Sequence, residues 1–373
     1  MAFLFFPLAR YCGRERVKRA MDSLFVSLVI PFAVFSLWII WHYFRAEFVM
    51  MPSGRRLLRE PPAILYFSEI SHNAVARLPM VMLGLSVYLF FARKAWRKAL
   101  YLMLAVVFSV FLILTNSRTS GFAILLFLML TMFFCGWYRL EKKSTIYRLL
   151  FSIGLALFAG AVWFLLQKGV FALLQLSWSR FLPVHAVGTV QAQSSGADLG
   201  GIQARSYSSN IGTVGNRLPL YKASIIAMFS SPYRFFFGVT PADAVGVLQE
   251  TGVKGVLSDY GYVHVHNFFL QMGVSFGVPV MVGTIVFSVS LALRGVRILF
   301  GNSQGTMQGI WVLVLLAGCM LANDMLEAIL AFRPEFFCAA FYLLAGWITS
   351  VDSDIRREDA RVKQNRLKKD VNA

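Results

Sequence analysis

Charged side chains are scarce in this sequence. Asp, Glu, Lys and Arg make up 14% of its 373 residues, and hydrophobic residues make up 58%. A soluble domain of ordinary composition carries about 25% charged residues. Several apolar runs are also long enough to cross a bilayer as helices. The composition therefore excludes an ordinary soluble domain and predicts an all-α polytopic membrane protein.

Cysteine is also rare, and so is histidine. The four cysteines are Cys12, Cys135, Cys319 and Cys338, and their spacing is not that of metal ligands or a disulfide framework. The segments expected outside the membrane have no Gly-rich nucleotide loop, no H-E-x-x-H and no C-x-x-C. Nucleotide-sugar transferases and metallohydrolases are therefore not indicated. The sequence predicts neither a metal site nor a cofactor.

The apolar runs predict about eight transmembrane spans and a large loop between the fifth and the sixth. The expected spans are 23–41, 76–91, 99–114, 121–137, 149–166, 268–291, 309–330 and 336–348. They divide the chain into four parts: N-terminal membrane helices (1–166), a loop with amphipathic helices (167–265), C-terminal membrane helices (266–350) and a basic tail (351–373).

Basic residues outnumber acidic ones by 36 to 18. In a soluble protein this excess would suggest nucleic acid, but in a membrane protein basic loops mark the cytoplasmic side. With the N-terminus inside, every short inner loop is basic, and the inner segments hold 22 of the 36 basic residues. The charge thus predicts that both termini are cytoplasmic and that the large loop is periplasmic. The basic tail is expected to be a solvated segment near lipid headgroups.

Two arginines stand at the outer ends of expected spans. Arg118 lies in "LTNSRTSGF", a very short link between two spans, and Arg217 lies in "NRLPLYKASI", before an expected amphipathic helix. A guanidinium is always charged and its planar fork fits phosphate oxygens. From the pattern alone, an interface anchor is the favoured interpretation of Arg118, and a solvated loop charge is the favoured interpretation of Arg217. The loop residues Arg180, Arg205, Lys222 and Arg234 add positive charge to the same region.

The stretch "HVHNFFLQMGVSFG" places His264 and His266 just before an apolar run. An imidazole that is neutral near pH 7 can act as a general base, although histidine is also common at helix ends and interfaces. Asp324 and Glu327, three residues apart in the seventh expected span, share a helix face. Ionisable groups in a span usually pair or function. Their structural alternative is an ion pair with Arg118 or Arg333.

These motifs together resemble the O-antigen ligase and polymerase superfamily of bacterial inner-membrane proteins. "NSRTSGFAILL" is similar to the family's short turn between two spans, and a large loop follows it. Within the loop, "NRLPLYKASIIAMFSSPYRFFFGV" resembles the family's N-R, short helix, S-P and glycine turn. "HVHNFFLQMGVSFGVPV" resembles the ligase signature H-N, nine residues, then Gly. Val280 departs from the small or polar residue usual near the signature's end, and the family usually has more spans.

The resemblance implies a GT-C-like helical glycosyltransferase whose periplasmic loop caps a lateral cavity. The donor would be a glycan on undecaprenyl diphosphate and the acceptor a hydroxyl of lipid A–core in lipopolysaccharide biosynthesis. Transfer would need no nucleotide site, because the donor already carries its leaving group. It would be inverting, because the hydroxyl would attack the anomeric carbon directly, and metal-independent, because arginines would face the diphosphate. Arg118 and Arg217 would hold the diphosphate. His266 would be the base or position the acceptor, with His264 the next candidate.

Asn267 is expected to orient or cap its segment, and Tyr221, Asp324 and Glu327 are the other residues expected to support the site. Three other functions stay open. A polymerase would use the same donor to extend lipid-linked repeat units. A polysaccharide transporter could use Asp324 and Glu327 for proton coupling, but would be expected to show broken helices and an inverted repeat. A structural scaffold would need none of these side chains for transfer.

Overall fold

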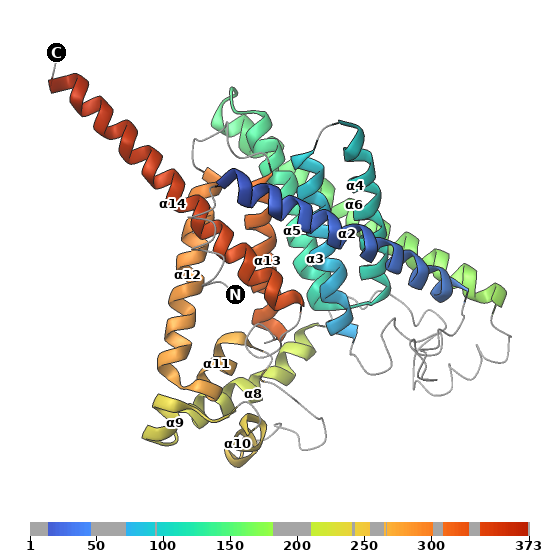
Figure 1. The fold of residues 1–373 in the computed structure, drawn as a ribbon. Helices are drawn as coiled ribbons and strands as arrows, with labels where there is room; N and C mark the ends of the chain where they lie inside the picture. The colour runs from blue at the N-terminus through green and yellow to red at the C-terminus, as the bar shows by residue number, and fades with distance from the viewer. Residues whose placement is uncertain are drawn as a thin grey trace. The chain divides into compact units, whose positions relative to one another are not determined.

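The computed structural model describes residues 14–45, 72–93, 95–181, 210–240, 243–253, 265, 267–300, 309–327 and 336–371. All regular secondary structure in these ranges is α-helical (Figure 1). The helices are α2 (Arg14–Phe44), α3 (His72–Ala92), α4 (Ala95–Leu114), α5 (Arg118–Arg139), α6 (Thr145–Phe181), α8 (Asn210–Phe229), α9 (Pro232–Phe237), α10 (Ala244–Glu250), α11 (Phe268–Phe276), α12 (Val278–Phe300), α13 (Ile310–Glu327) and α14 (Phe336–Val371).

The chain forms two compact units. One consists of Phe25–Val214 and holds most of α2 together with α3 to α6. The other consists of Met1–Leu24 and Gly215–Ala373, and holds most of α8 together with α9 to α14. Arg118 therefore belongs to the first unit, whereas Arg217 and Asn267 belong to the second.

In the first unit, α3 is the central helix. It contacts α4 and α5. In the most apolar stretch of α3, 72% of the residues are buried, compared with 22% in the most apolar stretch of α6. Hydroxyls on these apolar helices bond to the backbone one turn earlier: Ser86 Oγ donates to the Met82 carbonyl and Ser109 Oγ to the Ala105 carbonyl, both at 2.8 Å. Such local pairing lets a polar side chain sit in an apolar helix without an unsatisfied group.

Six described helices are long and apolar enough to cross a membrane, so the chain is a multi-pass membrane protein. They are Arg16–Phe44, Asn73–Ala92, Trp96–Leu114, Arg118–Arg139, Thr145–Trp178 and Val278–Phe300. The first five coincide with the first five expected spans. The helix at Ile310–Met325 is apolar but shorter, and the eighth expected span lies in the first part of α14. The count of eight spans stays a prediction.

The sixth expected span, 268–291, is not one continuous helix. Gly277, with φ 93°, ends α11 after nine residues, and the long apolar helix α12 begins at Val278. A positive φ is strained for any residue with a side chain and favours glycine. The residues on both sides of Gly277 are apolar, so the hydrophobic run continues through this point although the helix ends there. The expectation of an unbroken span was therefore wrong.

The fifth span is longer than expected. Helix α6 continues to Phe181, so the start of the expected loop is a helical extension of the span. This extension is fixed to the end of α2, since Trp178 Nε1 donates to the Tyr43 carbonyl at 2.9 Å and the two rings make an edge contact. The basic tail that begins at residue 351 is also helical, as part of α14, which ends at Val371.

Candidate active site

The turn between α4 and α5 positions Arg118. Asn116 takes a left-handed conformation with φ 47°, and Ser117 caps α5 by accepting from the Ser120 backbone N–H at 3.4 Å. Ser117 Oγ also donates to Asn73 Oδ1 at 2.9 Å. A serine cap satisfies one of the free N–H groups at a helix start. The bond to Asn73 therefore fixes the first residue of α5, Arg118, relative to the start of α3.

Arg118 is half-buried and lines a small cavity beside this turn. Its volume is about 10 Å³, which is room for about one water molecule. The lining residues are Leu112, Ile113, Asn116, Ser117, Arg118, Gly121, Trp163 and Gln167. The walls are partly polar, so the place suits an anionic oxygen. A whole diphosphate would need a wider opening than the first unit shows at this point.

Arg77 is a buried cation that the sequence analysis did not single out. It is 4% exposed and lies within the apolar helix Asn73–Ala92. Arg77 follows Asn73 by four residues, so the two side chains share the face of α3 that meets Ser117. Buried ionisable groups in a span usually mark functional sites. In the sequence the only signal was an arginine just inside the start of an expected span, where snorkelling is common.

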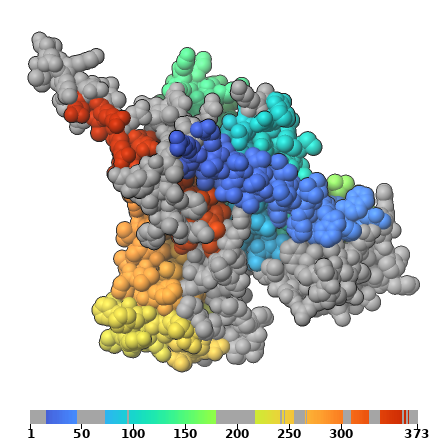
Figure 2. Space-filling view, viewed as in Figure 1, coloured from blue at the N-terminus to red at the C-terminus, as the bar shows by residue number. Residues whose placement is uncertain are grey.

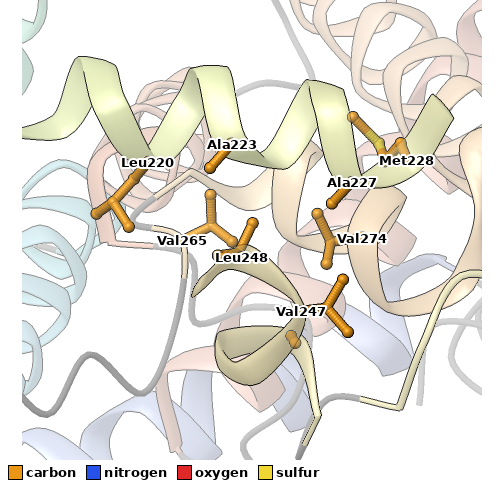
Figure 3. Close-up of a cluster of buried hydrophobic side chains, with 9 residues drawn as sticks. Leu220, Ala223, Ala227, Met228, Val247, Leu248, Val265 and Val274 are labelled. Atoms are coloured by element: carbon orange, nitrogen blue, oxygen red, sulfur yellow. The ribbon is translucent and has the colours of Figure 1, made fainter. Parts of the chain in front are cut away.

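In the second unit, a buried apolar cluster joins α8 to the segment that precedes α11. Figure 3 shows one face of α8 packed against α10, with Val265 and Val274 completing the cluster. The members are Leu220, Ala223, Ala227, Met228, Ala244, Val247, Leu248, Val265 and Val274. The α8 members recur at intervals of three, four and one residues, as one buried face of an amphipathic helix does. The expected amphipathic helix that ends at "SSP" is therefore present as α8.

Arg217 and Tyr221 lie one turn apart on α8, beside this buried face. The expectation that Arg217 precedes the amphipathic helix was wrong, because α8 already begins at Asn210. Both are half-buried, and Tyr221 packs against the cluster. Lys222 is exposed and lines an open groove of about 850 Å³. Leu218, Pro219, Ile226, Thr251, Gly252 and Val253 complete its walls. The groove is within the size range of ligand pockets, and it combines apolar walls with one ammonium group.

Val265, the single residue between the two histidines, is buried and holds this part of the chain in place. Val265 is 0% exposed, and its backbone N–H donates to Gln271 Oε1 at 2.7 Å. Gln271 is itself buried and donates through Nε2 to Ser275 Oγ at 3.0 Å. His264 and His266, the neighbours of Val265 in the sequence, lie outside the described residues. The structure describes the residues on either side of His266, and both are held by hydrogen bonds: Val265 to Gln271 and Asn267 to Leu270.

Asn267 is the N-cap of α11. Its Oδ1 accepts from the Leu270 backbone N–H at 3.1 Å, and its backbone is extended with φ −153°. At the other end of the helix, a Cβ on Gly277 would meet the carbonyl oxygen of Phe236 in α9. Likewise, a Cβ on Gly238 would lie 2.5 Å from the Phe276 nitrogen. The two glycines let α9 approach the end of α11 closely enough for backbone contact.

The aromatic segment that follows α8 forms a short helix, α9. Ser231 caps α9 by accepting from the Arg234 backbone N–H at 3.2 Å, and Pro232 takes the first helical position, which is favoured for proline. Arg234 forms an ion pair with Glu250 of α10 at 2.9 Å and also donates to Ser230 Oγ. Of the loop cations considered above, Arg234 is thus neutralised locally, whereas Arg180 and Arg205 have no described side chain.

Asp324 is fully buried in α13, next to the buried Asn323. Glu327 is the last residue of the same helix, and its side chain is outside the described part. A pairing with Arg333 lies outside the described residues as well, so the ion pair stays a prediction. The described residues contain no group of three or more His, Cys, Asp or Glu that could hold a metal ion.

The fold thus defines a multi-pass helical membrane protein with basic and capped motifs at helix ends. Residues 103–285 match the family model described as O-antigen ligase. Residues 103–285 therefore form a domain of the O-antigen ligase family. No curated protein and no solved structure matched the chain.

The matched residues include each motif on which the resemblance rested. They contain the Arg118 turn, Arg217 on α8, Asn267 and Gly277, and they end within α12. At the level of the family, this indicates a glycosyltransferase-type ligase of lipopolysaccharide biosynthesis. Substrates of the family are in general a lipid-linked glycan and lipid A–core, and the family works in a membrane.

Proposed function

We propose that this protein is an O-antigen ligase of the bacterial inner membrane. It transfers glycan from undecaprenyl diphosphate to a hydroxyl of lipid A–core at the periplasmic face, with both termini cytoplasmic. The observation that carries the proposal is the packing of Val265 against α8. This contact brings the chain beside His266 to the helix that bears Arg217, across almost fifty residues of sequence.

The roles follow from the chemistry of the reaction. The oxygen of the acceptor hydroxyl attacks the anomeric carbon, the bond from that carbon to the diphosphate oxygen breaks, and the configuration inverts. His266 takes the hydroxyl proton, with His264 as the alternative base. The diphosphate leaves with the bonding electrons and gains charge. Cationic donors fixed where this charge develops stabilise the transition state.

Arg217 and Arg118 are the proposed diphosphate ligands, with Arg118 pairing with a single phosphate oxygen because its cavity of about 10 Å³ cannot hold a whole diphosphate. Arg217 is half-buried, so its charge is partly shielded from water and its fork can pair with phosphate oxygens. Arginine supplies the positive charge without a metal, and for that reason we propose metal-independent transfer. Lys222 adds an ammonium in the neighbouring groove, whose apolar walls suit the lipid part of a substrate. Tyr221 and Asn267 hold α8 and α11 in place, and Asp324 and Glu327 support the membrane helices.

A deletion strain tests the proposal, because the rival functions leave different products. Loss of a ligase leaves bare core and accumulates long glycan on the lipid carrier. Loss of a polymerase leaves core capped with one repeat unit, and that result would overturn the ligase assignment. Loss of a transporter leaves lipid-linked glycan on the cytoplasmic side. Complementation with the wild-type chain should restore capped core, and Arg234→Ala should complement as well as wild type.

A further inference from the structure

A buried carboxylate at the end of the apolar part of α14 gathers three arginines. Asp352 is 0% exposed. Its Oδ1 accepts from Arg297 Nη1 at 2.5 Å and its Oδ2 from Arg356 Nε at 3.0 Å, while Arg294 Nη1 lies 3.7 Å from Oδ2. Arg294 and Arg297 belong to α12, so the group ties α12 to α14.

The group carries an excess of positive charge at its surface. Three guanidiniums share one carboxylate, which leaves two positive charges that Asp352 does not balance. The side chains of Arg294, Arg297 and Arg356 are 30%, 41% and 56% exposed, whereas the Asp352 side chain is 0% exposed. Asp354 is two residues further on, about 200° around the helix, and so points away from Asp352. The carboxylate is therefore inside and the surplus cations are outside.

These cations stand at the end of an apolar strip. Helix α12 is a candidate span, and only 17% of the residues in its most apolar stretch are buried. Figure 2 shows this helix at the surface, in orange. Its exposed apolar residues include Val286, Val289, Leu293, Val296 and Phe300. Arg297 follows Leu293 by four residues and precedes Phe300 by three, so all three share one face. Arg297 lies in the last turn of α12, and basic residues at the end of a span favour the side where lipid headgroups are anionic.

We propose that Arg294, Arg297 and Arg356 form a binding site for the phosphate of an anionic phospholipid. The acyl chains lie along Leu293 and Val289, and the phosphate oxygens pair with the guanidinium forks. Basic pockets between membrane helices are known to hold anionic headgroups. A soluble phosphate would gain nothing from the apolar strip, which is why the site suits a phospholipid. Asp352 is the positioning residue, because it holds the three arginines together. The site is separate from the transfer reaction.

The test is native mass spectrometry of the full chain, purified in neutral detergent and titrated with phosphatidylglycerol or phosphatidylcholine. Wild-type protein should retain phosphatidylglycerol in preference, and inorganic phosphate at the same concentration should not displace it. Arg297→Gln should weaken phosphatidylglycerol binding roughly five-fold, since a juxtamembrane arginine contributes that factor near an anionic surface. If thermal unfolding shows that Arg297→Gln does not fold, Arg356→Gln replaces it in this test, because the Arg356 side chain is more exposed. The same weakening of phosphatidylglycerol binding is expected.

The matched control is Arg139→Gln. Arg139 is an exposed arginine at the end of another span, α5, and its loss should leave phosphatidylglycerol retention unchanged. Equal losses in both variants would mean that net charge alone attracts the lipid, and would overturn the site. Equal retention of both lipids by wild-type protein would overturn it too, and displacement by inorganic phosphate would exclude a phospholipid as the specific occupant.

Discussion

Asn267 and Gly277 are the two ends of one helix. Asn267 Oδ1 accepts from the Leu270 N–H at 3.1 Å, and the Gly277 N–H donates to the Gly273 carbonyl at 2.9 Å. The nine residues between them make up all of α11. The spacing of the signature, H-N, nine residues, then Gly, is therefore the length of this helix. Both end residues have a structural role, and His266 is the signature residue that these contacts do not explain.

Replacing Gly277 by alanine should destabilise the protein. The backbone has φ 93° there, and a Cβ would meet the Phe236 carbonyl oxygen. Such strain costs about 1–3 kcal/mol, so thermal unfolding in detergent should shift clearly downward. Gly283→Ala in α12 is the control, because a Cβ at that position meets nothing within 4 Å. Equal unfolding temperatures for the two variants would contradict the close approach of α9 and α11.

Loss of the α11 cap should have a smaller effect. Asn267→Ala leaves the Leu270 N–H without its side-chain acceptor and should cost about 1 kcal/mol. Asn267→Ser keeps an acceptor and should retain most of the stability. Thermal unfolding measures both variants, and transfer activity should fall with Asn267→Ala because the cap is adjacent to His266. If serine were no better than alanine, the cap would not be what the asparagine contributes.

Arg217→Ala should lower transfer strongly. If the guanidinium stabilises the leaving diphosphate, kcat/KM should fall by roughly 10²-fold, and Arg217→Lys should recover only part of it because lysine lacks the planar fork. Arg234→Ala is the matched control in the same unit, since Glu250 already pairs with that arginine. Steady-state transfer rates with purified protein distinguish the three. Comparable losses for Arg217→Ala and Arg234→Ala would point to a general effect of loop charge.

Ser117→Ala tests the turn that carries Arg118. The change removes both the cap on α5 and the bond to Asn73, and should cost about 1–2 kcal/mol. Transfer should fall as well, because the start of α5 is no longer fixed to α3. Ser144→Ala removes a similar but exposed contact at the start of α6 and should be milder in both measurements. A fully active, destabilised Ser117→Ala protein would argue against a role for the position of Arg118.

Hydropathy predicted the first five membrane helices because each is a long apolar run bounded by charged or polar residues. It could not predict the break at Gly277, since the residues on both sides are equally apolar and only the backbone conformation changes. The extension of α6 to Phe181 was missed for a related reason. The residues beyond 166 are less apolar, but Trp178 finds a partner in the Tyr43 carbonyl of a distant helix.

For the candidate site, Asn267 was expected to orient or cap its segment, and it is the N-cap of α11. Arg77 was missed because an arginine near the end of a span resembles an interface anchor, and only packing shows that it is 4% exposed. The pairing of Arg234 with Glu250 depends on how α9 and α10 turn toward each other. Such a pairing, sixteen residues apart, has no periodic signal in the sequence.

The most direct test of the proposed function is transfer by the purified protein from an undecaprenyl diphosphate-linked glycan to lipid A–core, with and without His266→Ala. We expect wild-type protein to form capped core without an ion gradient or nucleotide. Loss of a general base costs about 10²- to 10⁴-fold in rate, so His266→Ala should fall in that range with an unchanged unfolding temperature, and His264→Ala should stay closer to wild type. Wild-type rates in His266→Ala, or no transfer to core by the wild-type protein, would contradict the account.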